Sequence, residues 1–177
     1  PIDGENIKTW VRCNSPSIMS GFGGAGAFSD GKYNITNDFG GNLHEYIGKT
    51  KALELMRYVD SINLQYGGEG TKLYSTANTS IRRKCLENGL HLLDAEVRHL
   101  GTDINYVVLQ RLYEYLREKA EFHFDALVSD VKRTETGYEI LVNGQETHSA
   151  PILVISVGRS GSKWMEGICR EMGIQTR

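Results

Sequence analysis

Apolar positions along the chain predict four helices. The first covers residues 43–64, where apolar side chains return every three or four positions, and the glycines at 67–70 end it. Three further helices are expected at 79–87, 104–119 and 162–172. Helix is therefore predicted over a large share of the chain.

Capping residues support the second and third of these helices. Asn78 or Thr79 is suited to begin the second helix, because a short polar side chain can accept a hydrogen bond from the first turn. Asn88 followed by Gly89 is a typical end. Asp103 is predicted to be the N-cap of the third helix.

Strands are predicted between and after the helices, from short alternating or apolar runs. They are expected at 91–98, 121–125, 127–133, 138–142 and 145–150. The last two are joined by Asn143-Gly144, a strong signal of a two-residue hairpin turn. These runs predict a β-meander near the C-terminal end.

A different kind of strand is predicted at 152–157. This run, Ile-Leu-Val-Ile-Ser-Val, follows Pro151 and is apolar on both faces, as in a buried parallel strand. A turn at 158–161 leads into the last helix. Ligands of open α/β sheets bind at such strand ends, so Gly158 and Arg159 are candidate ligand-binding residues. The alternative is an ordinary tight connection. The elements together predict an α/β fold.

The first 42 residues are irregular and rich in glycine. Within them, residues 21–32 read Gly-Phe-Gly-Gly-Ala-Gly-Ala-Phe-Ser-Asp-Gly-Lys, and Gly21, Gly23 and Gly26 satisfy the pattern G-x-G-x-x-G. A true dinucleotide fingerprint needs a strand before it and a helix after it. The flanking residues favour neither, so the pattern alone does not predict a Rossmann site.

The same segment resembles a P-loop, with Gly26, Gly31 and Lys32 in place, but Tyr33 stands where the Mg²⁺-ligating hydroxyl is required. The interpretation that remains is a glycine loop lying against a ligand held mostly by other parts. A plain flexible loop is the alternative. The candidate ligand-binding residues of the loop are Gly21, Gly23, Gly24, Ala25, Gly26, Ser29, Asp30, Gly31 and Lys32.

Composition narrows the function classes. The 177 residues are 40% hydrophobic and 24% charged, which is typical of a globular protein. A formal charge of −2 and scattered basic residues give no electrostatic case for nucleic acid or an anionic membrane. Cys13, Cys85 and Cys169 are far apart and predict free thiols. With no signal peptide and no long apolar stretch, we expect a cytoplasmic protein.

A family resemblance rests on the glycine segment. Residues 19–32 resemble the signature of the predicted NAD(FAD)-utilising dehydrogenases, a broad flavoprotein family. The resemblance extends to Gly40-Gly41, to Arg-His-Leu-Gly-Thr-Asp at 98–103 and to Val-Ile-Ser-Val-Gly-Arg-Ser-Gly at 154–161. The segments occur in the family's order and together cover most of the chain.

The resemblance implies a partial FAD-binding, glutathione-reductase-like domain that lacks its first βαβ unit. It implies a cofactor-proximal segment at 1–42, a mainly helical insertion at 43–100, and a helix, β-meander, strand and helix of the FAD domain at 101–177. The glycine loop is then expected near the flavin, and Gly158 and Arg159 approach the cofactor. The chain is expected to be an internal fragment that contacts the remainder of its parent polypeptide.

The implied function is that of an FAD-dependent oxidoreductase, a dehydrogenase in which FAD is the redox centre and NAD(P)H an electron donor. The fragment alone is expected to be inactive, and no side chain stands out as an acid, base or nucleophile. The alternative function is a non-catalytic nucleotide-binding or protein-interaction domain that uses the same glycine loop.

Other polar residues leave two interpretations open. Arg98, His99 and Asp103 form either a polar cluster facing substrate or flavin, or a turn with solvated side chains. Cys13 precedes the glycine loop but has no partner thiol in a C-x-x-C pattern, so we expect it to be inert. The remaining histidines lack metal-ligand spacing, and no metal site is predicted.

Overall fold

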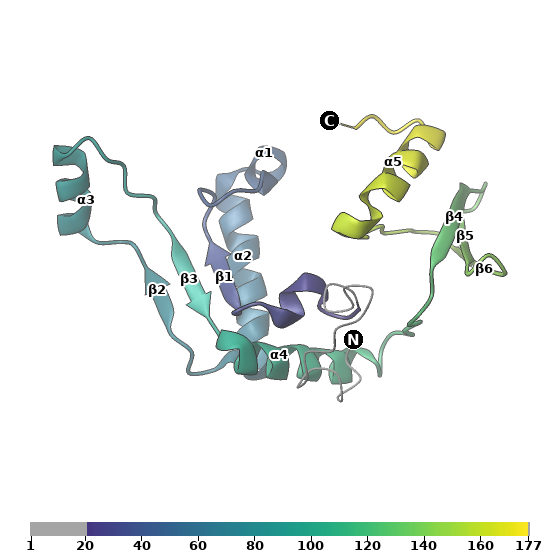
Figure 1. Ribbon diagram of the computed structural model, residues 1–177, viewed down its shortest axis with the longest axis horizontal. Coiled ribbons are helices and arrows are strands. Elements are labelled where there is room, and N and C mark those ends of the chain that lie inside the picture. The colour runs from purple at the N-terminus through teal and green to yellow at the C-terminus, as the bar shows by residue number, and fades with distance from the viewer. Residues whose placement is uncertain (1–20, 177) are drawn as a thin grey trace. The chain divides into compact units, whose positions relative to one another are not determined.

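The computed structural model describes residues 21–176 of the chain (Figure 1). Contacts divide the chain into two compact units, Pro1–Phe122 and His123–Arg177, which we describe separately as unit 1 and unit 2. Helix makes up 43% and strand 17%, so the mixed α/β class is confirmed. The predicted division into 1–42, 43–100 and 101–177 describes a flavin domain and stays a prediction.

The described part of unit 1 has an antiparallel sheet of strand order β1-β3-β2. Its strands are β1 (Lys32–Ile35), β2 (Leu73–Ser75) and β3 (Glu96–His99). The central strand, β3, confirms only the second half of the strand predicted at 91–98. The two outer strands were not predicted, because each is short and is defined by pairing with the distant β3.

The first predicted helix is present but divided. It comprises α1 (Leu43–Ile47) and α2 (Lys49–Asn63), which continues into a π-helical turn, η3 (Leu64–Gly68). Gly48 separates α1 from α2 with φ 82° and ψ 154°, a conformation that glycine adopts without steric cost. Gly67 then ends the helical path at φ 129°, as the glycines there predicted.

The second predicted helix is confirmed as α3 (Thr79–Glu87), at the tip of the excursion between β2 and β3 (Figure 1). Asn78 is its N-cap: the side-chain Oδ1 accepts a hydrogen bond from the backbone N–H of Ile81 at 3.0 Å. Gly89 follows the helix with φ 69°, as expected at a C-terminal stop.

The third helix, α4 (Gly101–Leu116), begins earlier than predicted. Asp103 lies in its first turn, so the prediction that Asp103 is the N-cap is wrong. The backbone N–H of Leu100 already donates to the Gly31 carbonyl at 2.9 Å, and Gly101 turns the chain into the helix with φ 77°. The core of unit 1 gathers around this helix and includes the buried Val108.

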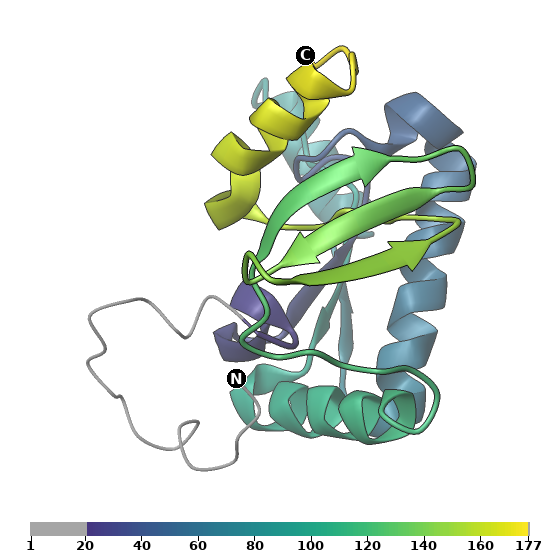
Figure 2. The same cartoon turned by 90° about the vertical axis from the view of Figure 1, so that its right-hand side faces the viewer.

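Unit 2 contains the predicted meander, with β4 (Val128–Arg133), β5 (Tyr138–Val142) and β6 (Glu146–Ala150) in sequence order (Figure 2). Asn143 and Gly144 have φ of 52° and 69°, so both central turn residues are left-handed, as a type I′ hairpin requires. The strand predicted at 121–125 is absent from the described backbone.

The predicted parallel strand at 152–157 is also absent. This run is followed by the 3₁₀ turn η4 (Arg159–Gly161) and by α5 (Ser162–Glu171), which confirms the last helix. Within the described chain, the run makes no backbone hydrogen bond, and the side chains of Ile152 and Val154 are 78% and 83% exposed. A parallel strand exists only between partners, and neither described sheet supplies one to it.

Candidate functional site

The glycine-rich segment is an ordered loop that leads directly into β1. It contains the 3₁₀ helix η2 (Gly24–Phe28), and Gly21, Gly23, Gly24 and Gly31 all have positive φ. The 3₁₀ helix η2 overlaps the end of the G-x-G-x-x-G pattern, and the next element is the strand β1 rather than an α-helix. This confirms that the loop has the context of neither a dinucleotide fingerprint nor a P-loop.

Two glycines of the loop have a packing role. A Cβ atom at Gly31 would lie 3.0 Å from the Cβ atoms of Leu100 and Asn105 and from the Gly101 carbonyl oxygen. At Gly23 it would lie 3.0 Å from a methyl carbon of Leu109. These glycines therefore allow the loop to approach the beginning and middle of α4 closely.

The other glycines leave an open face. A Cβ atom at Gly24 or Gly26 would meet nothing within 4 Å. Gly21, Ala25 and Gly26 are exposed. Gly24 has φ 51° and its N–H donates to the Gly21 carbonyl at 3.0 Å, so what a ligand can approach at Gly24 and Gly26 is a backbone surface without side chains. This part of the predicted ligand-binding set remains available to a ligand.

The polar side chains of the loop are engaged within it. Ser29 Oγ donates to the Gly26 carbonyl at 2.9 Å and accepts from the Gly31 N–H at 3.1 Å. Lys32 and Asp30 form an exposed ion pair of 2.8 Å, and the hydrogen bond from Lys32 lowers the pKa of Asp30. Ser29 thus shapes the loop, while the Lys32–Asp30 pair is exposed and is worth little to stability.

Asn105 fastens the loop, and sequence reasoning missed it. This α4 side chain is fully buried; its Nδ2 donates to the Gly26 carbonyl at 2.8 Å, and its Oδ1 accepts from the Tyr33 hydroxyl at 2.8 Å. Burial also raises the pKa of Tyr33. The available signal was an asparagine among the apolar positions of a helix, since a buried amide needs polar partners.

An aromatic cluster holds the other end of the loop. Phe22, between Gly21 and Gly23, packs edge-on against Tyr113 of α4 and against Phe122, with ring centroids 5.5 and 6.0 Å apart. Such edge-to-face pairs are favourable beyond the area that they bury. With Asn105, the cluster ties the glycine loop to α4 at two points.

Gly158 and Arg159, the other predicted ligand-binding residues, belong to unit 2. Gly158 turns the chain with φ 64° before η4, and Arg159 is exposed. Gly158 also lines an open cavity of about 600 Å³ along one side of α5, together with Val157, Met165, Glu166, Cys169 and Arg170.

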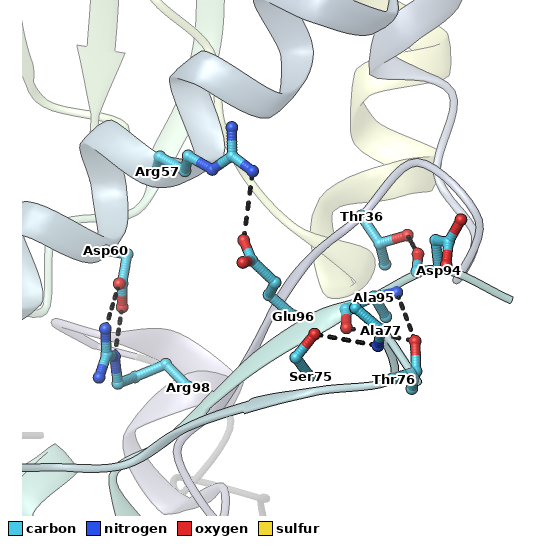
Figure 3. A network of polar contacts seen from close by, with 10 residues as sticks. All are labelled: Thr36, Arg57, Asp60, Ser75, Thr76, Ala77, Asp94, Ala95, Glu96 and Arg98. Carbon is cyan, nitrogen blue, oxygen red and sulfur yellow. Dashed lines mark hydrogen bonds and ion pairs between the residues drawn. The ribbon is translucent and has the colours of Figure 1, made fainter. Parts of the chain in front are cut away.

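Arg98, His99 and Asp103 do not form one cluster. Arg98 is buried and faces Asp60 of α2, with two hydrogen bonds of 2.9 and 2.8 Å, and it also donates to the Thr71 carbonyl (Figure 3). The hydrogen bonds to Asp60 raise the pKa of Arg98. His99 and Asp103 are exposed. Arg98 is thus part of the interior of unit 1 rather than of a ligand site.

A second cavity lies in unit 1 and was not predicted. It is a groove of about 510 Å³ at the end of the sheet where β1 and β2 finish and β3 begins, lined also by α2 and α3. Its charged residues are Asp38, Lys49, Arg57, Arg82, Asp94 and Glu96. Arg57 pairs with Glu96 at 3.3 Å (Figure 3), and Arg82 pairs with Asp94. No sequence signal united these charged residues, because they come from four separate segments.

Two further observations limit the chemistry of the described residues. They contain no group of three or more potential metal ligands, and none of their helices combines the length and apolarity needed to cross a bilayer. Cys85 and Cys169 are free thiols; Cys13 lies outside the described range. Comparison of the chain with family models, with curated proteins and with solved structures found no match.

Proposed function

We propose that this chain is part of an FAD-dependent oxidoreductase, in which the glycine loop of unit 1 contacts the cofactor. The observation that carries the proposal is that one side of the loop packs against α4 while the other side is open. Gly23, Gly31 and Asn105 hold it against α4, while Gly24 and Gly26 are left bare toward solvent. A loop fastened from behind and without side chains in front is preorganised for the close approach of a cofactor to its backbone.

Unit 2 supports the same proposal in a different way. The apolar run 152–157 is extended and makes no backbone hydrogen bond with any described residue. It is followed by the positive-φ turn at Gly158 and by α5. Strand, tight turn and helix is the order in which cofactor domains of the α/β type present a strand end to a ligand. We propose that a parallel sheet elsewhere in the parent polypeptide pairs with this run.

In the proposed enzyme, FAD supplies the redox chemistry and NAD(P)H serves as electron donor. The role proposed for this chain is to bind and orient the cofactor. Gly24 and Gly26 leave room for the cofactor at the loop, and Gly158 with Arg159 provides a turn of positive charge for an anionic group. The chain alone is proposed to be inactive, and the proposed location is the cytoplasm.

The pairing proposed for 152–157 is tested with Val154→Lys in the protein encoded by the complete reading frame. A lysine at this position should prevent the apolar run from entering a sheet and should lower the flavin-to-protein ratio of the purified protein at least about tenfold. Thr147→Lys, on the exposed strand β6, is the matched control and should retain flavin. Full flavin content in Val154→Lys would contradict the pairing.

The alternative function is a non-catalytic nucleotide-binding or interaction domain. The exposed apolar side chains of Ile152 and Val154 favour an interaction role, because they need a partner whether or not a flavin is present. The two functions differ in flavin content: the alternative predicts a protein that assembles through 152–157 but remains colourless.

A further inference from the structure

We propose that the groove at the end of the unit 1 sheet binds a zwitterionic amino acid, with the ligand carboxylate at Lys49 and the ligand ammonium at Asp38. The proposal rests only on the groove and is independent of flavin chemistry. The groove of about 510 Å³ exceeds the volume of a single amino acid, so the ligand enters without rearrangement of the backbone.

The balance of charge selects a ligand with both signs. The groove is lined by three basic and three acidic side chains, namely Lys49, Arg57, Arg82, Asp38, Asp94 and Glu96. Four of them already form the pairs Arg57–Glu96 and Arg82–Asp94. Lys49 and Asp38 form no ion pair with a described residue. One positive and one negative side chain are therefore left to receive a ligand.

These two residues lie at the same end of the groove. Asn37, which precedes Asp38, donates from its side-chain Nδ2 to the backbone carbonyl of Lys49 at 3.2 Å. This hydrogen bond joins the loop after β1 to the first residue of α2. The segments that carry Asp38 and Lys49 are thereby joined, and both residues line the groove.

Asn37 adds an independent indication of a missing donor. Its side-chain Oδ1 is buried and has no hydrogen-bond partner among the described residues. In the observed orientation of the amide, Nδ2 donates to the Lys49 carbonyl and Oδ1 is left without a donor. The region beside Asp38 therefore lacks one hydrogen-bond donor, and an ammonium group is a donor of this kind.

The rest of the groove suits an apolar side chain. Ile35, Leu53, Ala77 and Ala95 line it between the charged residues, and Leu53 lies one turn from both Lys49 and Arg57 on the same face of α2. A ligand that extends from Lys49 along this face meets a methyl-rich wall. The ligand class is accordingly an amino acid with an apolar side chain of moderate size.

Isothermal titration of the 177-residue chain with L-leucine tests the proposal. We expect saturable binding of L-leucine, and binding at least about tenfold weaker for 4-methylpentanoate and 3-methylbutylamine, each of which lacks one charge. Lys49→Met and Asp38→Asn should each weaken L-leucine binding at least about tenfold. Lys51→Met, which removes an exposed lysine of α2 that does not line the groove, should leave it unchanged.

The proposal would be overturned if L-leucine gave no saturable heat. It would also be overturned if either singly charged analogue, or inorganic phosphate, bound with the affinity of L-leucine. A third contrary result would be that Lys49→Met and Asp38→Asn bind L-leucine as tightly as Lys51→Met does. Far-UV circular dichroism checks that each variant is folded. If a variant is not folded, the backbone amide chemical shifts of the wild-type chain, measured by NMR, test the site instead. L-leucine should shift the amide resonances of Asn37 and Lys49, and unchanged resonances would exclude the site.

Discussion

At the scale of the residue, buried polar side chains define the interior of unit 1. Arg98 and Asp60 are about as exposed as core residues, with 8% and 7% of their surface accessible, yet each carries a charge. Their paired hydrogen bonds offset the cost of removing both charges from water. Asn105 has the same role for the glycine loop, where its amide satisfies a carbonyl and a hydroxyl.

Breaking the buried pair should be far more costly than breaking an exposed one. Asp60→Ala leaves the Arg98 guanidinium buried without its carboxylate, and should lower the free energy of unfolding by about 3–5 kcal/mol. Glu87→Gln removes the exposed pair with Arg83 on α3 and should cost at most about 0.5 kcal/mol. Urea denaturation measures both; similar losses in the two variants would refute the buried role of Asp60.

Tyr33 should titrate above its ordinary pKa of 10.0, because burial disfavours its charged form. A raised pKa in the folded state means that the stabilisation is complete below pH 10 and is lost as the pH rises through the raised value. Ultraviolet difference titration of wild type against Tyr33→Phe isolates this tyrosine. A Tyr33 component that ionises at or below pH 10 would contradict the buried environment.

At the scale of the element, glycine positions decide how the loop meets α4. Gly31 has φ 61° and close neighbours on three sides, whereas Gly26 has open space around it. The same substitution should therefore be costly at Gly31 and nearly neutral at Gly26. The pattern G-x-G-x-x-G contains the packing Gly23 and the open Gly26 but not the packing Gly31, so the motif does not mark which glycines pack.

Gly31→Ala should destabilise the chain by about 2–4 kcal/mol, from left-handed strain together with overpacking against Leu100 and Asn105. Gly26→Ala should change the unfolding free energy by no more than about 0.5 kcal/mol. Thermal or urea unfolding monitored by circular dichroism compares them. Equal stabilities for the two variants would show that the loop does not pack on α4 as described.

The elements that could be predicted from the sequence are those specified locally. α3 could be predicted from Asn78 and Gly89, and the β5–β6 hairpin from Asn143 and Gly144. Caps and tight turns depend on a few adjacent residues. β1 was missed because it exists only through pairing with β3, more than sixty residues away along the chain. Long-range pairing leaves little trace in a single short segment.

The candidate site followed the same rule. The glycine loop could be recognised from its own residues, but Asn105, which fastens it, lies on a distant helix. The groove could not be predicted, since its lining residues are brought together only by the fold of β1, β2, β3, α2 and α3. The run at 152–157 shows the converse: its apolar pattern predicts a strand, but a strand also needs partners.

At the scale of the whole molecule, two small antiparallel sheets are each accompanied by helices. Unit 1 holds an open glycine loop and a charged groove; unit 2 holds a meander and an unpaired apolar run. An exposed run of this kind is a liability in isolation, because it invites association with other chains. We propose that a sheet in the parent polypeptide covers this run by pairing with it, and that the same sheet completes the flavin site.

The visible absorption spectrum of the protein encoded by the complete reading frame tests the central claim most directly. The proposed function predicts the two visible bands of an oxidised flavin in the purified protein, bleached on anaerobic addition of NADH or NADPH. The 177-residue chain alone should show no such bands. A colourless complete protein whose spectrum does not change on addition of FAD would contradict the assignment.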